Sequence, residues 1–152
     1  MNAVAPNPDG LSGLEQLKAI FPTDRPPGHL GLGSKLGFDF IEIEEGRVVF
    51  GATPDESVYN PIGTVHGGYA ATLLDSAVGS AVHTKLKAGQ GYATLELKVA
   101  YHRPMTAATG PVRAEGRVVQ VGRRAAFAEG RLTDLEGRLY ASATTTCLVF
   151  ER

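Results

Sequence analysis

The 152-residue sequence predicts an α+β fold in which a curved antiparallel sheet wraps around one long buried helix. The first observation is the segment 67–82, which is small or apolar on every side of a helix and carries a single charge, as is typical of a buried helix. The second is a series of four strand-like runs after it, joined by connections so short that neighbouring strands must be antiparallel. A sheet with one apolar face must be covered, and the helix is available to cover it.

The chain before the helix divides into two parts. Residues 1–35 are predicted to form an N-terminal segment with a short helix, residues 14–21, and a loop rich in Pro and Gly. From residue 36 the pattern changes, and the apolar runs that flank Glu45-Gly46 predict a hairpin. Residues 53–66 are predicted to be a loop, because they contain two prolines and a glycine.

The chain after the helix supplies the strand-like runs, which are residues 94–102, 111–121, 123–133 and 138–150. In the first run, alternation with a period of two puts Thr94 on a polar face with Glu96 and Lys98. The opposite, apolar face is formed by Leu95, Leu97, Val99 and Tyr101. One buried helix inside such a sheet is the hotdog architecture, which assigns residues 36–152 to one domain.

Composition narrows the classes of function. Fifteen Lys and Arg against 16 Asp and Glu leave a formal charge of −1, with no basic excess to hold nucleic-acid phosphates. The first residues lack the basic and apolar regions of a secretory signal, and no run of about 18 apolar residues occurs that would span a membrane. The single cysteine, Cys147, lies in an apolar run and is predicted to be inert core. The sequence thus predicts a cytoplasmic protein without a nucleic-acid or membrane partner.

Asp75 is the one charged residue of the predicted central helix. Burying a carboxylate is unfavourable unless it is paired or hydrogen-bonded, so an acid in an otherwise uncharged helix is a candidate functional group. The structural alternative is that Asp75 caps a neighbouring turn or faces a wet seam.

His66-Gly67-Gly68 stands where this helix begins. The first turn of a helix leaves backbone N–H groups unpaired and carries a partial positive charge, and glycine lets a ligand approach that backbone closely. The segment therefore suits an oxyanion or a polarised carbonyl. The alternative is a helix start at which the glycines only allow tight packing.

The spacing of these two features predicts a homodimer. Gly67 and Asp75 are eight residues apart, which is roughly 12 Å along a helix at ~1.5 Å per residue. An Asp side chain cannot bridge that distance. If both residues act on one carbonyl, they come from different subunits, and the active sites are composite.

Two further polar residues are candidates for the same site. The amide of Asn60 is able to orient a water or to hold His66, and the hydroxyl of Thr94 is able to hold a water or the Asp75 carboxylate. Each also has a plainer structural interpretation, because Asn is common in turns before proline and Thr is common on strands.

These motifs together resemble those of the PaaI-type hotdog thioesterases. The resemblance runs in one order from about residue 36 to residue 150. It is carried by Asn60-Pro61-Ile62-Gly63-Thr64-Val65-His66-Gly67-Gly68, by Leu73-Leu74-Asp75-Ser76-Ala77, by Tyr92-Ala93-Thr94-Leu95-Glu96-Leu97 and by Tyr101-His102-Arg103-Pro104.

The resemblance implies hydrolysis of an aryl- or medium-chain acyl-CoA thioester, without a metal or a cofactor. Asp75 corresponds to the catalytic carboxylate, as general base or as nucleophile, and some relatives have Glu there, which leaves that choice open. Gly67 corresponds to the backbone donor that polarises the thioester carbonyl. Asn60 and His66 correspond to a pair that lines the opposite side of the site, and Thr94 to a hydroxyl that places the water. Members of the family form dimers and often dimers of dimers.

CoA carries phosphates, so cations are expected around the site. The candidates for binding CoA are Arg103, Arg123 and Arg124, together with Gly68 at the helix start. Each arginine alone is equally consistent with an ordinary solvated residue.

Two other functions compete with hydrolysis. A non-catalytic acyl-CoA-binding hotdog module would need a partner or a DNA-binding segment, and the N-terminal segment is short and not basic. A hotdog dehydratase acting on acyl thioesters would need a His and an acid to converge, as His66 and Asp75 would across a dimer. The flanking motifs resemble those of the hydrolases, which favours hydrolysis.

Overall fold

The computed structural model describes residues 10–20 and 31–152, so the predictions for the first nine residues and for residues 22–30 of the Pro- and Gly-rich loop lie outside the described residues. The loop was predicted to extend to residue 33, which was wrong for its last three residues, because they begin a short helix. In chain order the elements are α1 (Gly13–Ile20), α2 (Gly31–Lys35), β1 (Asp39–Glu44), β2 (Arg47–Ala52), the 3-10 turn η1 (Glu56–Val58), α3 (Gly67–His83), β3 (Gln90–Tyr101), the 3-10 turn η2 (Ala107–Thr109), β4 (Val112–Val121), β5 (Ala125–Asp134) and β6 (Leu139–Glu151).

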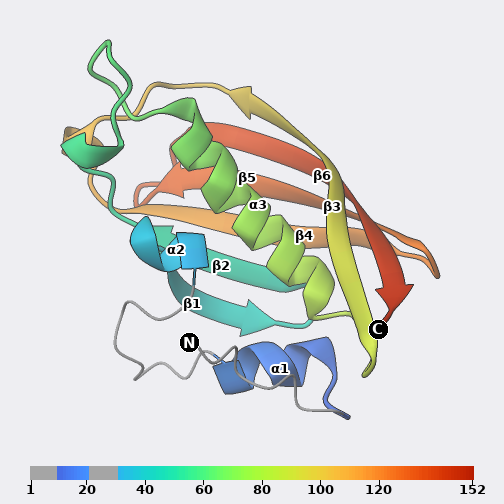
Figure 1. The fold of residues 1–152 in the computed structure, drawn as a ribbon. Coiled ribbons are helices and arrows are strands. Elements are labelled where there is room, and N and C mark those ends of the chain that lie inside the picture. Colours follow the sequence, from blue (N-terminus) through green and yellow to red (C-terminus); the bar gives the residue numbers. More distant parts are fainter. Residues whose placement is uncertain (1–9, 21–30) are drawn as a thin grey trace.

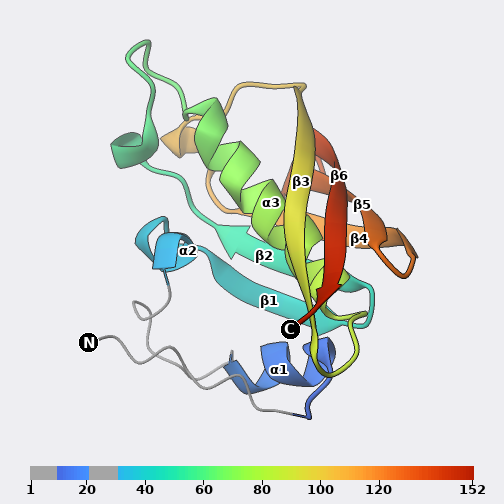
Figure 2. The ribbon, with the colours of Figure 1, turned by 45° about the vertical axis from the view of Figure 1, so that its right-hand side comes forward.

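The strands form a six-stranded antiparallel sheet in the order β1-β2-β4-β5-β6-β3. The sheet curves around α3, which lies along its concave face (Figures 1 and 2). The predicted α+β hotdog fold is therefore confirmed. Strand β3 is the edge strand next to β6, although it directly follows the helix in the chain.

A pair of glycines lets the helix lie close to the sheet. Gly116 on β4 and Gly130 on β5 are direct cross-strand partners. A Cβ atom on Gly116 would lie 2.3 Å from the carbonyl oxygen of Ala77, and one on Gly130 would lie 2.9 Å from a methyl group of Val78. Both glycines therefore lie directly beneath the middle of α3, where a larger residue on β4 would push the helix away.

The helix is buried on one side only, which corrects the expectation of burial all round. Its inward face contributes Leu73, Leu74, Ala77, Val78, Ala81 and Val82 to the core. A stripe on the other side is exposed or only partly buried, and consists of Gly68, Ala71, Thr72, Asp75, Ser76 and Ser80. The physical reason is that the sheet of one chain ends at β3 and covers part of the helix circumference. Small residues on the stripe made the helix resemble a fully buried one.

Strand β3 differs from the predicted alternation in two ways. It begins four residues earlier, at Gln90, because Gly91 pairs with Phe150 in the sheet instead of ending the helix segment. It also contains a bulge between Thr94 and Glu96, which leaves Leu95 without a partner on β6 and 60% exposed. A bulge adds one residue and reverses the alternation beyond it. Thr94 therefore lies on the concave face with Tyr101, and the prediction that these two residues lie on opposite faces of the strand was wrong.

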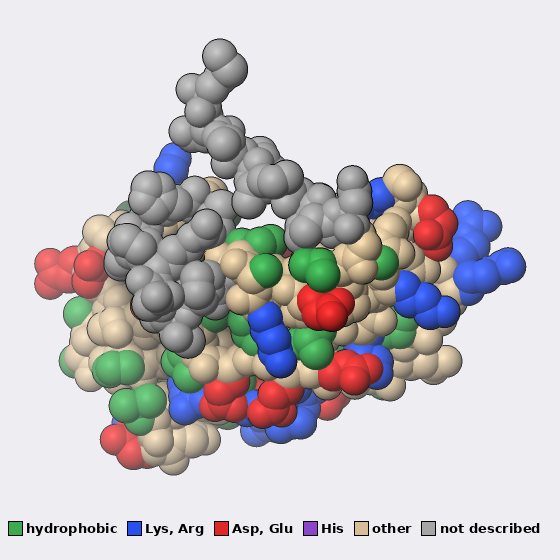
Figure 3. Space-filling model, turned by 90° about the horizontal axis from the view of Figure 1, so that it is seen from below, with side chains coloured by type: hydrophobic (Ala, Val, Ile, Leu, Met, Phe, Trp, Pro, Cys, Tyr) green, Lys and Arg blue, Asp and Glu red, His purple; other side chains and the backbone are tan. Residues whose placement is uncertain are grey.

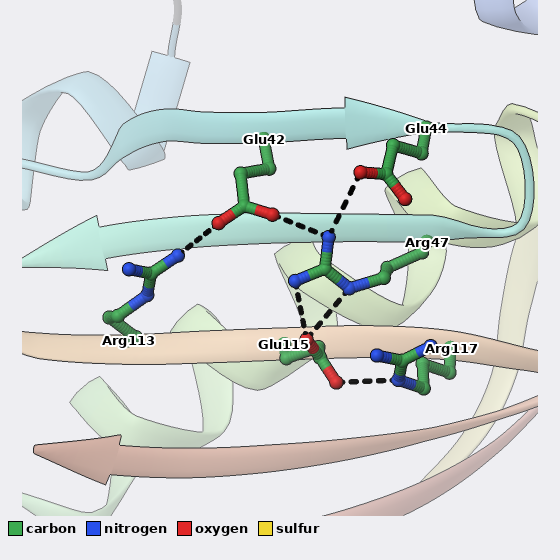
Figure 4. A network of polar contacts seen from close by, with 6 residues as sticks. All are labelled: Glu42, Glu44, Arg47, Arg113, Glu115 and Arg117. Carbon is green, nitrogen blue, oxygen red and sulfur yellow. Dashed lines mark hydrogen bonds and ion pairs between the residues drawn. The ribbon is translucent and has the colours of Figure 1, made fainter. Parts of the chain in front are cut away.

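The outer face of β1, β2 and β4 is joined by a charged network (Figure 4). Arg47 pairs with Glu42 at 2.5 Å and with Glu115 at 2.7 Å, and Arg113 also contacts Glu42. The Arg47 guanidinium holds the pKa of Glu42 below its usual value. On the face seen in Figure 3, acidic and basic side chains lie next to one another.

Helix α1 packs on the far end of α3. Its predicted helical segment, residues 14–21, corresponds to Gly13–Ile20 in the structure. The amide of Gly13 donates to the carbonyl of Leu86 at 2.9 Å, and the Gln16 side chain lies 3.1 Å from Nε2 of His83. Among the described residues, no helix is both long enough and apolar enough to cross a membrane.

Candidate active site

The start of α3 is built around His66, which caps the helix. The Nδ1 atom of His66 accepts a hydrogen bond from the backbone N–H of Gly68 at 2.8 Å. The His66 backbone N–H donates to the carbonyl of Val58 at 2.8 Å, which fixes the entering chain. Because the Gly68 N–H already has a partner, the predicted contact of CoA with Gly68 is not available through that group in this arrangement.

Gly67 presents the free donor of this helix start. In the described part of the chain, no acceptor bonds the backbone N–H of Gly67. Its carbonyl oxygen accepts a hydrogen bond from the Tyr101 hydroxyl at 2.8 Å. A Cβ on Gly67 would lie 3.2 Å from the Tyr101 ring, so glycine is the residue that this close approach accommodates. The N–H of Gly67 therefore has the position of a helix-terminal anion donor.

A pocket of about 380 Å³ opens at this point. Its lining combines apolar side chains with a few polar ones: Val65, His66, Gly67, Ala70, Tyr101, His102, Arg103, Pro104, Met105, Tyr140 and Ala141. A mostly apolar cavity with few convergent polar groups is typical of a site for a small organic group. Three of the residues predicted from sequence, His66, Gly67 and Arg103, meet here.

Asp75 lies two turns further along α3, on the open stripe, and is partly buried. The hydroxyl of Thr94 donates to its Oδ1 at 3.1 Å. The sequence interpretation in which Thr94 holds the Asp75 carboxylate thus agrees with the geometry, and it depends on the β3 bulge. Cys147 is buried nearby, and burial raises the pKa of its thiol, so it is not poised to act as a nucleophile.

Asn60 organises its own loop in the single chain. Its Oδ1 accepts hydrogen bonds from the N–H groups of Ile62 at 3.1 Å and Thr64 at 3.2 Å, and its Nδ2 donates to the Thr64 hydroxyl at 2.9 Å. The structure shows no bond from Asn60 to His66 among the described residues. The turn interpretation therefore accounts for the contacts that Asn60 makes within one chain.

The three candidate arginines do not lie together in one chain. Arg103 lines the pocket, and its guanidinium carbon lies 5.9 Å from the centre of the Tyr140 ring. The backbone N–H of Arg103 donates to the carbonyl of Tyr140 at the start of β6. The backbone carbonyl of Arg124 accepts a hydrogen bond from the N–H of Val149 near the end of β6, and Arg123 is the exposed residue before it. Tyr140 and Val149 are nine positions apart on β6, which is about 30 Å at ~3.3 Å per residue.

The site of one chain is thus divided into two halves. One half holds the free N–H of Gly67 and the pocket, and the other holds the Asp75 carboxylate with Thr94. Sequence reasoning also missed part of the first half. Tyr101 was interpreted as an apolar strand residue, and Tyr140 and Met105 were not considered. The spacing of Tyr101 from the helix start gives no signal of their contact, which the β3 bulge creates.

A curved antiparallel sheet that wraps around one helix, with a small apolar pocket at the helix start, defines a hotdog-fold protein. The family model of the thioesterase superfamily matches residues 62–141. That range contains the helix, its glycine start and the β3 edge.

Comparison with individual proteins agrees. The proofreading thioesterase EntH of Klebsiella pneumoniae is 30% identical over 103 residues, which are 68% of this chain and 74% of that protein. A solved variant of the phenylacetic acid degradation protein PaaI from Thermus thermophilus is 29% identical with a TM-score of 0.69, over 76% of this chain and 96% of that one. A Streptococcus mutans protein solved with acetyl CoA is 27% identical with a TM-score of 0.68, over 76% and 90% of the two chains.

The chain therefore belongs to the thioesterase superfamily, and within it to the PaaI-type hotdog proteins. It is a thioester hydrolase.

Proposed function

We propose that this protein hydrolyses an aryl- or medium-chain acyl-CoA to the free acid and CoA. The observation that carries the proposal is the free backbone N–H of Gly67 at the wall of an apolar pocket. The acyl group would occupy that pocket, and the thioester oxygen would accept from Gly67. The acetyl CoA bound to the Streptococcus mutans relative supports an acyl-CoA as the substrate class.

The chemistry requires a polarised carbonyl and an activated water. As a general base, Asp75 takes a proton from water while the water oxygen bonds the thioester carbon. The carbonyl oxygen then carries a negative charge, which the Gly67 N–H stabilises; removing one such donor costs about 3–4 kcal/mol in other enzymes. The tetrahedral intermediate collapses with cleavage of the C–S bond, and the proton held by Asp75 returns to the leaving thiolate. With Asp75 as nucleophile, a carboxylate oxygen bonds the thioester carbon, and the same donor stabilises the tetrahedral intermediate. Cleavage of the C–S bond then releases the CoA thiolate and leaves an anhydride, which water cleaves to the free acid and the Asp75 carboxylate.

The two halves of the site meet in a homodimer under this proposal. The same chain holds Gly67 and Asp75 two turns apart on one rigid helix, so one small carbonyl cannot contact both. Three features of the single chain support a second copy as the occupant: the open stripe on α3, the free β3 edge, and the loop tip at Ile62, whose apolar side chain is 87% exposed. Dimers of dimers are the assembly that the family resemblance implies.

A partner chain would also change which arginines rim the site. Arg103 lies at the pocket that holds Gly67, whereas Arg123 and Arg124 lie toward the end of the sheet that holds Thr94. An antiparallel arrangement of two copies would bring the second pair toward the pocket of the first copy. The CoA phosphates would then contact arginines of both chains.

The test is thiol release from a panel of aryl- and straight-chain acyl-CoAs. Asp75→Asn is compared with wild type, and Asp39→Asn serves as a matched control, because Asp39 is exposed at the start of β1. Turnover in wild type and in Asp39→Asn, with loss in Asp75→Asn, supports the proposal. Equal turnover in all three proteins would remove Asp75 from the mechanism. A change in acyl unsaturation without thiol release would point to hydration chemistry.

A further inference from the structure

We propose that Tyr101 is a positioning residue for this reaction, because its hydroxyl holds the backbone at Gly67 so that the Gly67 N–H faces the pocket. This inference rests on the proposed function, in which that N–H polarises the thioester carbonyl.

The peptide unit between Gly67 and Gly68 is held on both of its polar groups. Its C=O accepts from the Tyr101 hydroxyl at 2.8 Å, and its N–H donates to Nδ1 of His66 at 2.8 Å. The preceding peptide unit is held as well, since the His66 carbonyl accepts the first backbone hydrogen bond of the helix at 3.0 Å. The two units that flank the Gly67 Cα are therefore fixed, and with them the direction of the Gly67 N–H.

Gly67 needs such a restraint more than another residue would. A Cβ at this position would lie 3.2 Å from the Tyr101 ring, so glycine is the residue that fits without a shift of that ring. Glycine has the widest range of backbone conformations. Gly67 is also the first residue of α3, so no preceding helical turn holds its N–H. A donor to a developing oxyanion is effective when its direction is set before the reaction. The hydrogen bond from Tyr101 thus restrains a backbone that glycine alone would leave free to vary.

Tyr101 reaches Gly67 because of the bulge in β3. Thr94 and Tyr101 are seven positions apart on β3, and strict alternation would send them to opposite faces of the sheet. The bulge at Leu95 puts both on the concave face, so one strand supports Asp75 with its Thr94 hydroxyl and Gly67 with its Tyr101 hydroxyl. The Tyr101 side chain is 56% exposed, and burial therefore does not explain its orientation.

The first experiment compares Tyr101→Phe with Tyr69→Phe. Tyr69 lies on α3, the helix that begins at Gly67. Its hydroxyl contacts the Leu36 carbonyl at 3.5 Å, outside the pocket. We expect Tyr101→Phe to lower kcat about tenfold, less than the ~10²–10³ that loss of an oxyanion donor itself costs. KM and the affinity for a thioether analogue, which has no carbonyl oxygen, should stay unchanged, as should all parameters of Tyr69→Phe.

Two spectroscopic measurements separate positioning from a structural role. In ¹⁵N spectra of the free protein, Tyr101→Phe should shift the amide signals of Gly67 and Gly68 and increase their mobility, while the melting temperature is retained. With a ketone analogue in which a methylene replaces the thioester sulfur, wild type should lower the carbonyl stretching frequency. Tyr101→Phe should lose part of that shift.

Several outcomes would overturn the inference. A kcat of Tyr101→Phe equal to that of wild type would do so, as would unchanged amide signals of Gly67. A loss confined to KM and to thioether affinity would make Tyr101 an acyl contact instead of a positioning residue. Absence of turnover in wild type on every acyl-CoA is a different failure, because it overturns the proposed function and with it the catalytic meaning of Tyr101.

Discussion

The Thr94 hydroxyl donates to the Asp75 carboxylate at 3.1 Å, which links edge strand β3 to the open stripe of α3. Asp75 is the single Asp, Glu, Lys or Arg of α3. This hydrogen bond from the Thr94 hydroxyl orients the carboxylate. An oriented carboxylate is what the proposed general-base step requires.

This contact predicts a selective effect of substitutions at Thr94. Thr94→Val keeps the shape of the side chain but removes the donor, so kcat should fall by about one order of magnitude, while Thr94→Ser should retain most activity. Steady-state hydrolysis of the best acyl-CoA measures both. Thr144→Val, an exposed position on the outer face of β6, is the matched control. Full activity of Thr94→Val would mean that the bond to Asp75 has no part in catalysis.

A composite site predicts complementation between two inactive variants. Gly67→Ala crowds the proposed carbonyl site against Tyr101, and Asp75→Asn removes the proposed base, so each protein alone should lose most of its turnover. After subunit exchange at equal amounts, a mixed dimer has one intact site, and random pairing should restore about a quarter of wild-type activity. The measurement is thiol release from the mixture and from each variant alone. A mixture no more active than its components would place both residues outside a shared site.

Packing between helix and sheet predicts unequal effects at the glycine pair. Gly116→Ala places a Cβ against the rigid backbone of Ala77, and should destabilise the fold by about 1–3 kcal/mol. Gly130→Ala meets methyl groups of Val78 and Leu74, which are able to move, and should have a smaller effect. Urea unfolding midpoints of the two variants test the difference. Equal midpoints would show that the helix backbone yields as easily as its side chains.

We expect the folding stability of the protein to fall in mild acid because of the buried His83. Burial, aided by the positive charge of Arg152, lowers the pKa of His83, and its buried Nδ1 has no hydrogen-bond partner among the described residues. The unfolded chain binds a proton near its ordinary pKa of ~6.5, whereas the folded chain resists it. Proton uptake therefore favours unfolding as the pH decreases through that value, until the lower folded pKa is reached.

The measurement is the melting temperature near pH 7.5 and near pH 5.5. We expect Tm to decrease by about 2–4 °C in acid, the change that ~1 kcal/mol produces in a domain of this size. The neighbours of His83 are the neutral Gln16 side chain and the Tyr92 ring, 5.8 Å away, so no described acid offsets the charge. His83→Gln should flatten the pH dependence. A His83→Gln variant with the wild-type pH dependence would assign the effect to other groups.

Local pattern predicted much of this protein. The run of small and apolar residues before Thr84 predicted α3 to within one residue of its end, and the turn residues separated the strands correctly. Gly67 and Asp75 were chosen from their chemistry and spacing, and the structure keeps them apart as the spacing required. Helix bounds, turns and the spacing of two residues on one helix depend on residues close together in the chain. The sequence pattern therefore predicts them directly.

The residue pattern alone predicted the strands, the helices α1 and α3, their order and the two chemical groups on the central helix, but not the short helix α2. The packing of the folded chain determines which faces those groups share. A single bulge at Leu95 reverses the alternation of β3, which brings Thr94 to Asp75 and Tyr101 to Gly67. The helix stripe is open because the sheet ends at β3, and Asn60 is occupied by its own turn. The physical reason is that bulges, edges and side-chain contacts are set by packing between segments far apart in the chain, and a pattern of neighbouring residues does not record that packing.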